Sequence, residues 1–273
     1  MRKRLLFLAL VVALAFTAGV VPGKADELLL PDVSPGLPGW NIDRYAPVVF
    51  SYLSAVNGVN NVIDLGIGTT GNFANRPIAY QSSFYNTQGE NNAISGGPGD
   101  DLEVLLYIPG SWSSPTNGDV RTDLWVNTAD SDYGILGFSN FGTNNELGLY
   151  TAGTFQTWND VTGAWTPVGA QVLYDQWNTL QIQYTNTGYN YFINGVGVGS
   201  VNIGAHGGAA LTQVLLEAYN FADPTLGVPE GVLTNPVPYD VYYAPDVPEP
   251  ATFGLIGFGL LGLAAAARRK FRA

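Results

Sequence analysis

Short apolar and polar runs alternate along most of this chain, and clusters of Gly, Asn, Pro and Asp separate them. A period of two places side chains on alternate faces of a strand, whereas a helix needs a period of 3.6, which the interior of the chain does not show. The pattern predicts strands at 48–53, 62–67, 78–85, 102–108, 119–126, 135–138, 147–150, 154–158, 179–184, 189–193, 196–201, 214–219 and 239–243. So many strands without an internal repeat predict an all-β fold, a two-sheet antiparallel sandwich.

The clearest local pattern lies in a segment rich in Tyr, Asn and Thr at residues 177–198. Leu180 and Ile182 fall on one face of a strand, and Asn194-Gly195 suits a two-residue hairpin turn that needs positive φ. We therefore expect a three-stranded meander. With its leading tryptophan it resembles the meander of laminin-G-like and concanavalin A-like jelly-roll domains, which implies a jelly-roll fold but marks no binding site.

The first 25 residues have the layout of a secretory signal peptide. Three basic residues follow Met1, residues 5–21 are apolar, and Gly23 and Ala25 supply the small side chains that a signal peptidase inspects. We expect signal peptidase to cut after Ala25. An uncleaved N-terminal anchor is the alternative.

The last residues combine an apolar run with a basic end. Residues 251–267 carry no charge, and at about 1.5 Å per residue they make roughly 25 Å of helix, at the short end of what spans a bilayer. Four basic residues in 268–273 hold the C-terminus on the cytoplasmic side by the positive-inside rule. We expect one transmembrane helix with the body of the chain outside; a buried core helix is the alternative.

Val247, Pro248, Glu249 and Pro250 directly precede that apolar run. The order of Pro-Glu-Pro triplet, apolar helix and basic end resembles the C-terminal sorting signal of the PEP-CTERM family of Gram-negative bacterial surface proteins. The resemblance implies that a membrane-embedded exosortase processes the chain near the triplet and delivers it to an envelope rich in exopolysaccharide. It concerns residues 246–273 and implies nothing about the activity of the rest.

These signals divide the chain into a signal peptide at 1–25, an extended lead-in at 26–36, a β-sandwich domain at 37–245 and a sorting signal at 246–273. All 22 acidic residues lie from Asp26 to Glu249, a span whose only basic residues are Arg44, Arg76 and Arg121, for a formal charge of −19. Such a body repels phosphates, so no nucleic-acid partner is expected. Its acidity fits solubility, calcium binding or life in a charged matrix.

Cysteine is absent and histidine occurs once, at His206. An exported domain without disulfides must be held together by its core, and the sandwich segment is long enough for one. The composition excludes thiol nucleophiles and metal sites that need two histidines. Because no Gly-x-Ser-x-Gly elbow is present, we expect no catalytic triad at His206.

Bacterial endoglucanases of the jelly-roll superfamily carry Glu-x-Asp-x-x-Glu or Glu-x-Asp-x-Glu on one strand, because alternate residues face the same cleft. Neither pattern occurs in this sequence. Asp101 with Glu103, and Asp130 with Asp132, come nearest, and both pairs abut turns. We therefore expect no catalysis; a glycoside hydrolase or lyase is the alternative.

Two tryptophans have the surroundings of sugar platforms. Trp112 lies in a Gly-Ser-Trp-Ser-Ser-Pro loop, and Trp158 is followed by Asn159 and Asp160. Exposed aromatic rings stack on sugar rings, and neighbouring polar side chains orient them. We expect glycan contacts at these four residues, with packing inside the sandwich as the alternative for each tryptophan.

Calcium is the ion that the aspartates of this chain would bind, because hard oxygen ligands suit it. Asp100 and Asp101 are adjacent, although no EF-hand spacing accompanies them. The wider set of candidate ligands is Asp100, Asp101, Asp119, Asp123, Asp130 and Asp132.

Taken together, these patterns predict an exported jelly-roll protein that is tethered to the inner membrane and then delivered to the cell surface. Its expected partners are signal peptidase, exosortase and an extracellular polysaccharide. Its expected role is that of a structural or glycan-binding component of that polysaccharide matrix.

Overall fold

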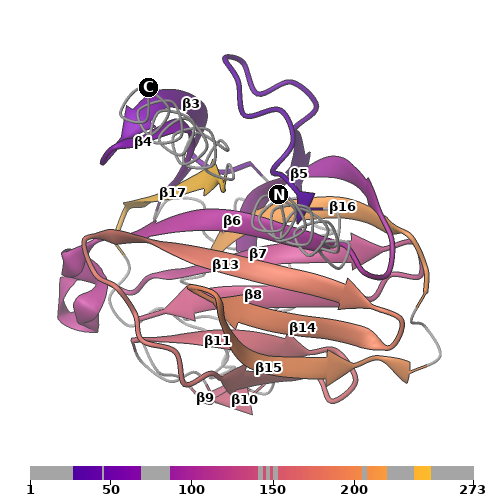
Figure 1. The fold of residues 1–273 in the computed structure, drawn as a ribbon. Coiled ribbons are helices and arrows are strands. Elements are labelled where there is room, and N and C mark those ends of the chain that lie inside the picture. The colour runs from indigo at the N-terminus through magenta and orange to yellow at the C-terminus, as the bar shows by residue number, and fades with distance from the viewer. Residues whose placement is uncertain are drawn as a thin grey trace, which may run out of the picture.

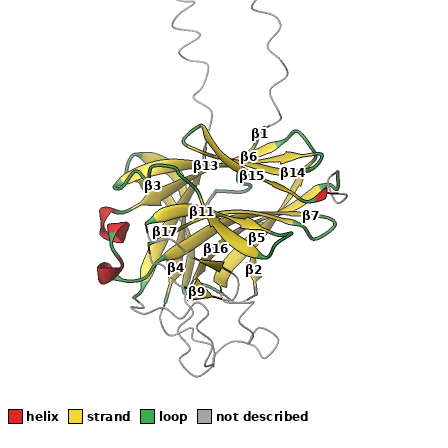
Figure 2. Ribbon diagram, turned by 90° about the horizontal axis from the view of Figure 1, so that it is seen from below, coloured by secondary structure: helices red, strands yellow, loops and turns green. Residues whose placement is uncertain are grey.

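Two β-sheets lie face to face in the computed structural model, which describes residues 27–44, 46–68, 87–140, 144–145, 148–149, 153–204, 208–219 and 237–246. Figure 2 shows the two layers of strands from below, with β6, β13, β14 and β15 in one and β5, β7, β11 and β16 in the other. Strand pairing is antiparallel except at one short parallel pair. The predicted all-β, two-sheet sandwich is confirmed.

The first sheet has eight strands, and its long central members run across the front of Figure 1. In spatial order it consists of β15 (Val196–Asn202), β14 (Gly188–Ile193), β13 (Gln176–Thr185), β6 (Asp101–Ile108), β17 (Tyr239–Pro245), β4 (Val59–Ile67) and β3 (Val49–Val56), with β1 (Glu27–Leu28) paired parallel to β6.

The second sheet has seven strands. In spatial order it consists of β12 (Ala164–Pro167), β11 (Thr154–Asn159), β8 (Tyr133–Ser139), β7 (Arg121–Thr128), β16 (Leu211–Tyr219), β5 (Thr87–Gly96) and β2 (Asn41–Asp43). A separate pair joins β9 (Asn144–Asn145) to β10 (Gly148–Leu149), and two 3₁₀ turns, η4 (Gly110–Ser113) and η5 (Pro115–Asn117), precede β7. Within the described residues, no helix has the length and apolarity needed to cross a membrane.

The main core fills the space between the two sheets. Strand β6 shows how alternation builds it: Leu102, Val104, Leu106 and Ile108 are fully buried, and the residues between them are not. The same inward alternation on β4, β13, β14 and β16 contributes the rest of the apolar cluster. Burial of so much apolar surface stabilises the domain without any disulfide.

The predicted meander is present as β13, β14 and β15. Asn194 and Gly195 both have positive φ, at 50° and 74°, so the turn between β14 and β15 has the conformation that its sequence requires. Leu180 and Ile182 face the core.

Strand β5 was not predicted, because its sequence Thr-Gln-Gly-Glu-Asn-Asn-Ala-Ile-Ser-Gly is rich in residues that are rare in strands. It forms because β16 on one side and β2 on the other satisfy its backbone groups. The short strands β1, β2, β9 and β12 were also missed. The strand predicted at 78–85 lies outside the described residues.

The expected lead-in takes part in the fold. β1 pairs with β6, and Leu30 is buried in the main core, with Leu37 and Trp40 beside it. The indole Nε1 of Trp40 donates a hydrogen bond to the carbonyl of Pro31 at 3.1 Å, which closes this segment into a turn against the sandwich.

Candidate functional site

Trp112 does not have the exposure expected of a sugar platform. Only 6% of its surface is accessible, and its ring stacks on Phe138 at 6.0 Å and meets the edge of Tyr239 at 5.8 Å. Its remaining edge lines a cavity of about 280 Å³. Because neighbouring rings cover the indole, this expectation is corrected: Trp112 is a core residue that closes one end of the sandwich.

Trp158 is partly exposed, and its ring lies 5.4 Å from that of Trp165. Its Nε1 donates to the carboxylate of Asp160 at 3.2 Å. The side chain of Asn159 accepts hydrogen bonds from the backbone of Val161 and Thr162, so it shapes the turn after β11. Glycan contact at Trp158, Asn159 and Asp160 stays a prediction.

Asp100 and Asp101 are both occupied by local contacts. A carboxylate oxygen of Asp100 accepts a hydrogen bond from the backbone of Gly97 at 2.7 Å, and Asp101 accepts one from the side chain of Gln181. Across the described segments, no three Asp, Glu, His or Cys side chains lie close enough together to hold a metal ion. Calcium binding at this pair stays a prediction.

Ala25 and the triplet Pro248, Glu249 and Pro250 lie outside the described residues, as do His206 and the predicted membrane helix. The structure therefore adds nothing to the expectations for these positions.

The structure reveals a polar row that crosses the outer face of the seven-stranded sheet, the face turned away from the main core. Each of the seven strands contributes one residue that is in direct register with a residue of the next strand, so the seven residues lie on one line across the sheet. The members of this polar row, from β12 to β2, are Pro167, Gln156, Gly137, Asp123, Glu217, Gly89 and Asp43. At about 4.8 Å per strand the row is roughly 29 Å long.

A second row, two residues further along the strands, is aromatic and apolar. Trp125, Ile135, Trp165 and Leu215 form a cluster separate from the main core, and Tyr133 and Trp158 pack against it. The outer face therefore carries aromatic rings beside the polar row; Trp125 and Trp165 are buried there, and Trp158 is partly exposed.

Asp123, at the centre of the polar row, is fully buried and paired with Arg121. The guanidinium donates to its Oδ2 at 2.6 Å and lies 4.4 Å from the ring centre of Trp165. Burial raises the pKa of Asp123, and the positive charge of Arg121 counteracts that rise. The other oxygen, Oδ1, has no hydrogen-bond partner among the described residues.

Glu217, the direct partner of Asp123 on the next strand, is also fully buried. Neither of its oxygens makes a hydrogen bond of good geometry with a described residue. Burial raises its pKa well above the ordinary value; Arg44 opposes the rise, and Asp43 adds to it. Arg44 forms an ion pair with Asp43 at 3.3 Å and donates a hydrogen bond to the hydroxyl of Thr87. Its guanidinium also lies over the ring of Trp125.

Two glycines in the polar row make room for these carboxyl groups. A Cβ on Gly137 would lie 2.0 Å from Oδ1 of Asp123, and a Cβ on Gly89 would lie 2.7 Å from Cδ of Glu217. The two carboxyl groups therefore lean away from each other, each over the neighbouring strand.

That leaning sets the distance between the two acids. Gly137 and Gly89 are three strand positions apart, and their Cβ positions would lie 3.0 Å and 2.7 Å from the carboxyl carbons of Asp123 and Glu217. At about 4.8 Å per strand, the carboxyl carbons are at least about 9 Å apart. This minimum exceeds the about 5–5.5 Å at which retaining glycosidases hold their two carboxyl groups.

Sequence reasoning did not find this site because its residues come from strands that are distant along the chain. One signal was available: the body has only three arginines, and two of them, Arg44 and Arg121, lie on this face. A rare cation at the start of a strand in so acidic a chain indicates an acidic partner nearby, and Asp123 stands two residues from Arg121.

Several solved structures share the sandwich at low sequence identity. An apo Crh5 transglycosylase is 13% identical, with 84% of this chain and 87% of that chain covered and a TM-score of 0.47. A β-glucanase of Bacillus licheniformis is 9% identical, with 80% and 95% covered and a TM-score of 0.43. A family 16 endo-glucanase from Bacteroides ovatus is 11% identical, with 75% and 92% covered and a TM-score of 0.44.

These matches correct the expectation of a chain without catalysis of its own. They concern the fold alone.

No curated protein matches the chain in sequence. The model of the PEP-CTERM protein-sorting motif does match, over residues 246–270. This range contains the triplet, the apolar run and the first basic residues, in the order that the sequence predicted. The C-terminus of this chain therefore carries a PEP-CTERM sorting motif, the signal of an exported, exosortase-sorted surface protein.

Proposed function

We propose that this surface-sorted chain acts on an extracellular polysaccharide along the outer face of its seven-stranded sheet. One observation carries the proposal: two fully buried carboxyl groups, Asp123 and Glu217, lie in direct register at the centre of a polar row with aromatic residues alongside it.

The two acids differ in a way that suits acid and base roles. Burial raises the pKa of Glu217 well above the ordinary value, which favours its protonated form. Asp123 faces the guanidinium of Arg121, which favours the charged form. In the proposed reaction Glu217 protonates the glycosidic oxygen, and Asp123 takes a proton from the attacking water.

The ends of the polar row are open, and its middle is covered. Pro167 at one end is exposed and Asp43 at the other is partly exposed, whereas Gln156, Asp123 and Glu217 are fully buried. A glycan would therefore make its first contacts at the rim, beside Trp158.

The direct test exposes the purified full-length chain, in detergent, to a panel of neutral and acidic bacterial exopolysaccharides. Binding is measured by affinity electrophoresis and cleavage by the reducing ends released over a day. We expect binding to at least one polysaccharide and release of oligosaccharides from it. The proposal would be refuted if no polysaccharide retarded the chain in electrophoresis and none released reducing ends.

Sorting is tested separately with Glu249→Ala. Exosortase processing near the triplet predicts that this variant accumulates in the membrane fraction at a higher apparent mass and that its amount at the cell surface falls at least tenfold. Quantitative immunoblots of surface and membrane fractions measure both quantities. Normal size and normal surface amount would contradict the role of the triplet.

A further inference from the structure

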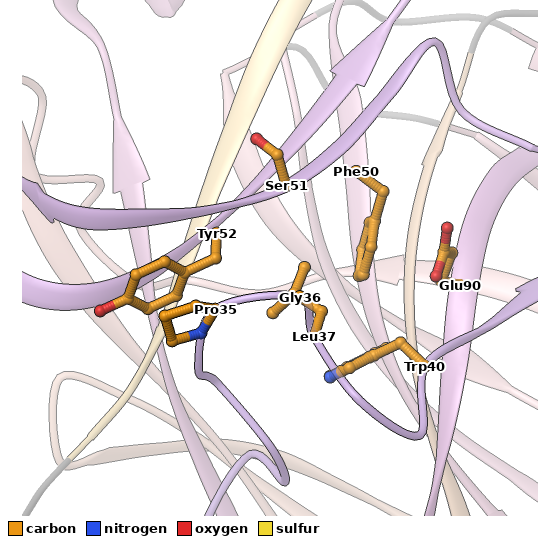
Figure 3. Close-up of a pocket in the computed structure, with 8 residues that line it drawn as sticks. All are labelled: Pro35, Gly36, Leu37, Trp40, Phe50, Ser51, Tyr52 and Glu90. Atoms are coloured by element: carbon orange, nitrogen blue, oxygen red, sulfur yellow. The ribbon is translucent and has the colours of Figure 1, made fainter.

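A second site lies on another part of the molecule, between the two sheets at their open edge. A cavity of about 460 Å³ is bounded by the turn at residues 35–37, by β3 of one sheet and by β5 of the other. Figure 3 shows the rings of Trp40 and Phe50 on one side of it, Tyr52 and Pro35 on the other, and the carboxyl group of Glu90 at its edge. Its volume is that of a small-molecule site.

Glu90 is unusual because it points inward. Its partner on β16, Leu216, is a fully buried member of the main core, so the side chain of Glu90 faces the space between the sheets. An inward position on a sandwich strand ordinarily carries an apolar residue. A carboxyl group there indicates a contact that an apolar side chain could not make.

The neighbours of Glu90 on the same face of β5 show what is missing. Gln88 donates a hydrogen bond to the carbonyl of Ala46 at 3.3 Å, and Asn92 donates one to the carbonyl of Pro38 at 3.4 Å. Glu90 lies between them and has no hydrogen bond or ion pair with a described residue. A carboxylate only accepts hydrogen bonds, so its partner has to be a donor.

The rest of the lining narrows the chemistry of that donor. The rings of Trp40 and Phe50 lie 5.4 Å apart, and the indole nitrogen of Trp40 is already bonded to Pro31. The hydroxyl of Tyr52 is bonded to the side chain of Asn61 at 3.0 Å. These aromatic residues therefore offer mainly their rings, and aromatic faces beside a carboxylate attract cations.

We propose that this cavity binds a small ligand that presents an ammonium group, held by the carboxylate of Glu90 and by the rings of Trp40, Phe50 and Tyr52. The acidic body of the chain, with a formal charge of −19, favours the approach of such a cation and disfavours an anion. This site is separate from the polar row and does not depend on the proposed action on polysaccharides.

Binding should depend on pH in a defined direction. Burial raises the pKa of Glu90 to about 6, and no other charged group contributes to that shift. Among the residues that line the cavity, Tyr52 is the one other titratable group. Because the cation needs the ionised carboxylate, affinity should be full above pH 6 and fall as the pH decreases through 6.

The test titrates choline and ethanolamine into the purified full-length chain by isothermal calorimetry. The comparison ligand is 3,3-dimethylbutan-1-ol, the neutral isostere of choline. We expect at least one of the two cations to bind, and at pH 7.5 to bind at least tenfold more tightly than the neutral alcohol. Lowering the pH to 5 should weaken the binding at least fivefold.

The decisive variant is Glu90→Gln, which keeps the shape of the side chain and removes its charge; we expect at least a tenfold loss of affinity. Asp64→Asn is the matched control, because Asp64 is a half-buried acid whose pKa burial also raises to about 6, on the outer face of the other sheet. Circular dichroism confirms that both variants are folded. Absence of binding by both cations, equal binding of the neutral alcohol, or unchanged affinity in Glu90→Gln would each overturn the proposal.

Discussion

Glu217→Gln is expected to lower the rate of polysaccharide cleavage at least a hundredfold. A positioned general acid contributes about a hundredfold to ten-thousandfold to a reaction rate, and glutamine has the shape of the acid without its proton. Glycan binding should change much less, because its first contacts lie at the rim beside Trp158. The measurement is the initial rate of reducing-end release, together with affinity electrophoresis on the same polysaccharide.

Asp64→Asn is the control for this variant as well, since it removes a half-buried acid on the other sheet and should leave the rate unchanged. The rate of the unmodified chain should fall at high pH as Glu217 loses its proton, and at low pH as Asp123 gains one. A rate in Glu217→Gln within threefold of that of the unmodified chain would rule out the acid role of this residue.

The spacing of the two acids adds a stereochemical outcome to the same experiment. Carboxyl carbons at least about 9 Å apart leave room for a water molecule and are too far apart for the covalent route, which needs about 5–5.5 Å. The sugar released should therefore have the inverted anomeric configuration. Proton nuclear magnetic resonance of the first product, recorded before mutarotation, distinguishes inversion from retention.

Arg121→Leu is expected to destabilise the fold by about 3–5 kcal/mol, because it leaves the fully buried Asp123 without its cation. The change also removes the guanidinium from the ring of Trp165. Urea denaturation followed by tryptophan fluorescence measures the free energy of unfolding. The double variant Arg121→Leu with Asp123→Leu should recover much of the loss, since it removes the stranded charge.

The matched control is Arg44→Leu. Arg44 pairs with Asp43, whose side chain is 23% exposed, so water can solvate the carboxylate that remains and the loss should be smaller than in Arg121→Leu, although the contacts of Arg44 with Thr87 and Trp125 are lost as well. Arg121→Leu should also be less destabilised at pH 5 than at pH 7. Its buried Asp123 has a raised pKa, so the folded state binds a proton more readily than the unfolded state, and stability falls as pH rises. Equal losses in the two variants would contradict the buried-pair account.

The two acids and the arginine illustrate how one cluster can serve both stability and chemistry. Burial raises the pKa of both carboxyl groups, and the paired guanidinium of Arg121 opposes that rise at Asp123 and stabilises its charged form. Gly137 and Gly89 are as important as the acids, because any side chain in their place would collide with a carboxyl group.

Local sequence was sufficient for the fold class and for the C-terminal sorting motif. The period of two on strands such as β6 and β13, and the Asn194-Gly195 turn, report the sandwich because alternation and turn residues act over a few neighbouring positions. The PEP-CTERM motif at 246–270 was readable for the same reason, as its parts are contiguous. Strand β5 was not readable, because its stability comes from the partners on either side and not from its own residues.

Both candidate sites depended on distant segments meeting. Asp123 and Glu217 are 94 positions apart in the chain and become neighbours only through the pairing of β7 with β16. Glu90 meets Trp40 and Phe50 only because the two sheets and the turn at 35–37 close around one cavity. Trp112 stood out in the sequence but is a core residue. Its exposure depends on what packs against it, and the rings that cover it, Phe138 and Tyr239, come from other strands. Strand pairing and burial therefore determine which acids and aromatic residues can act together, and neither can be read from the order of residues.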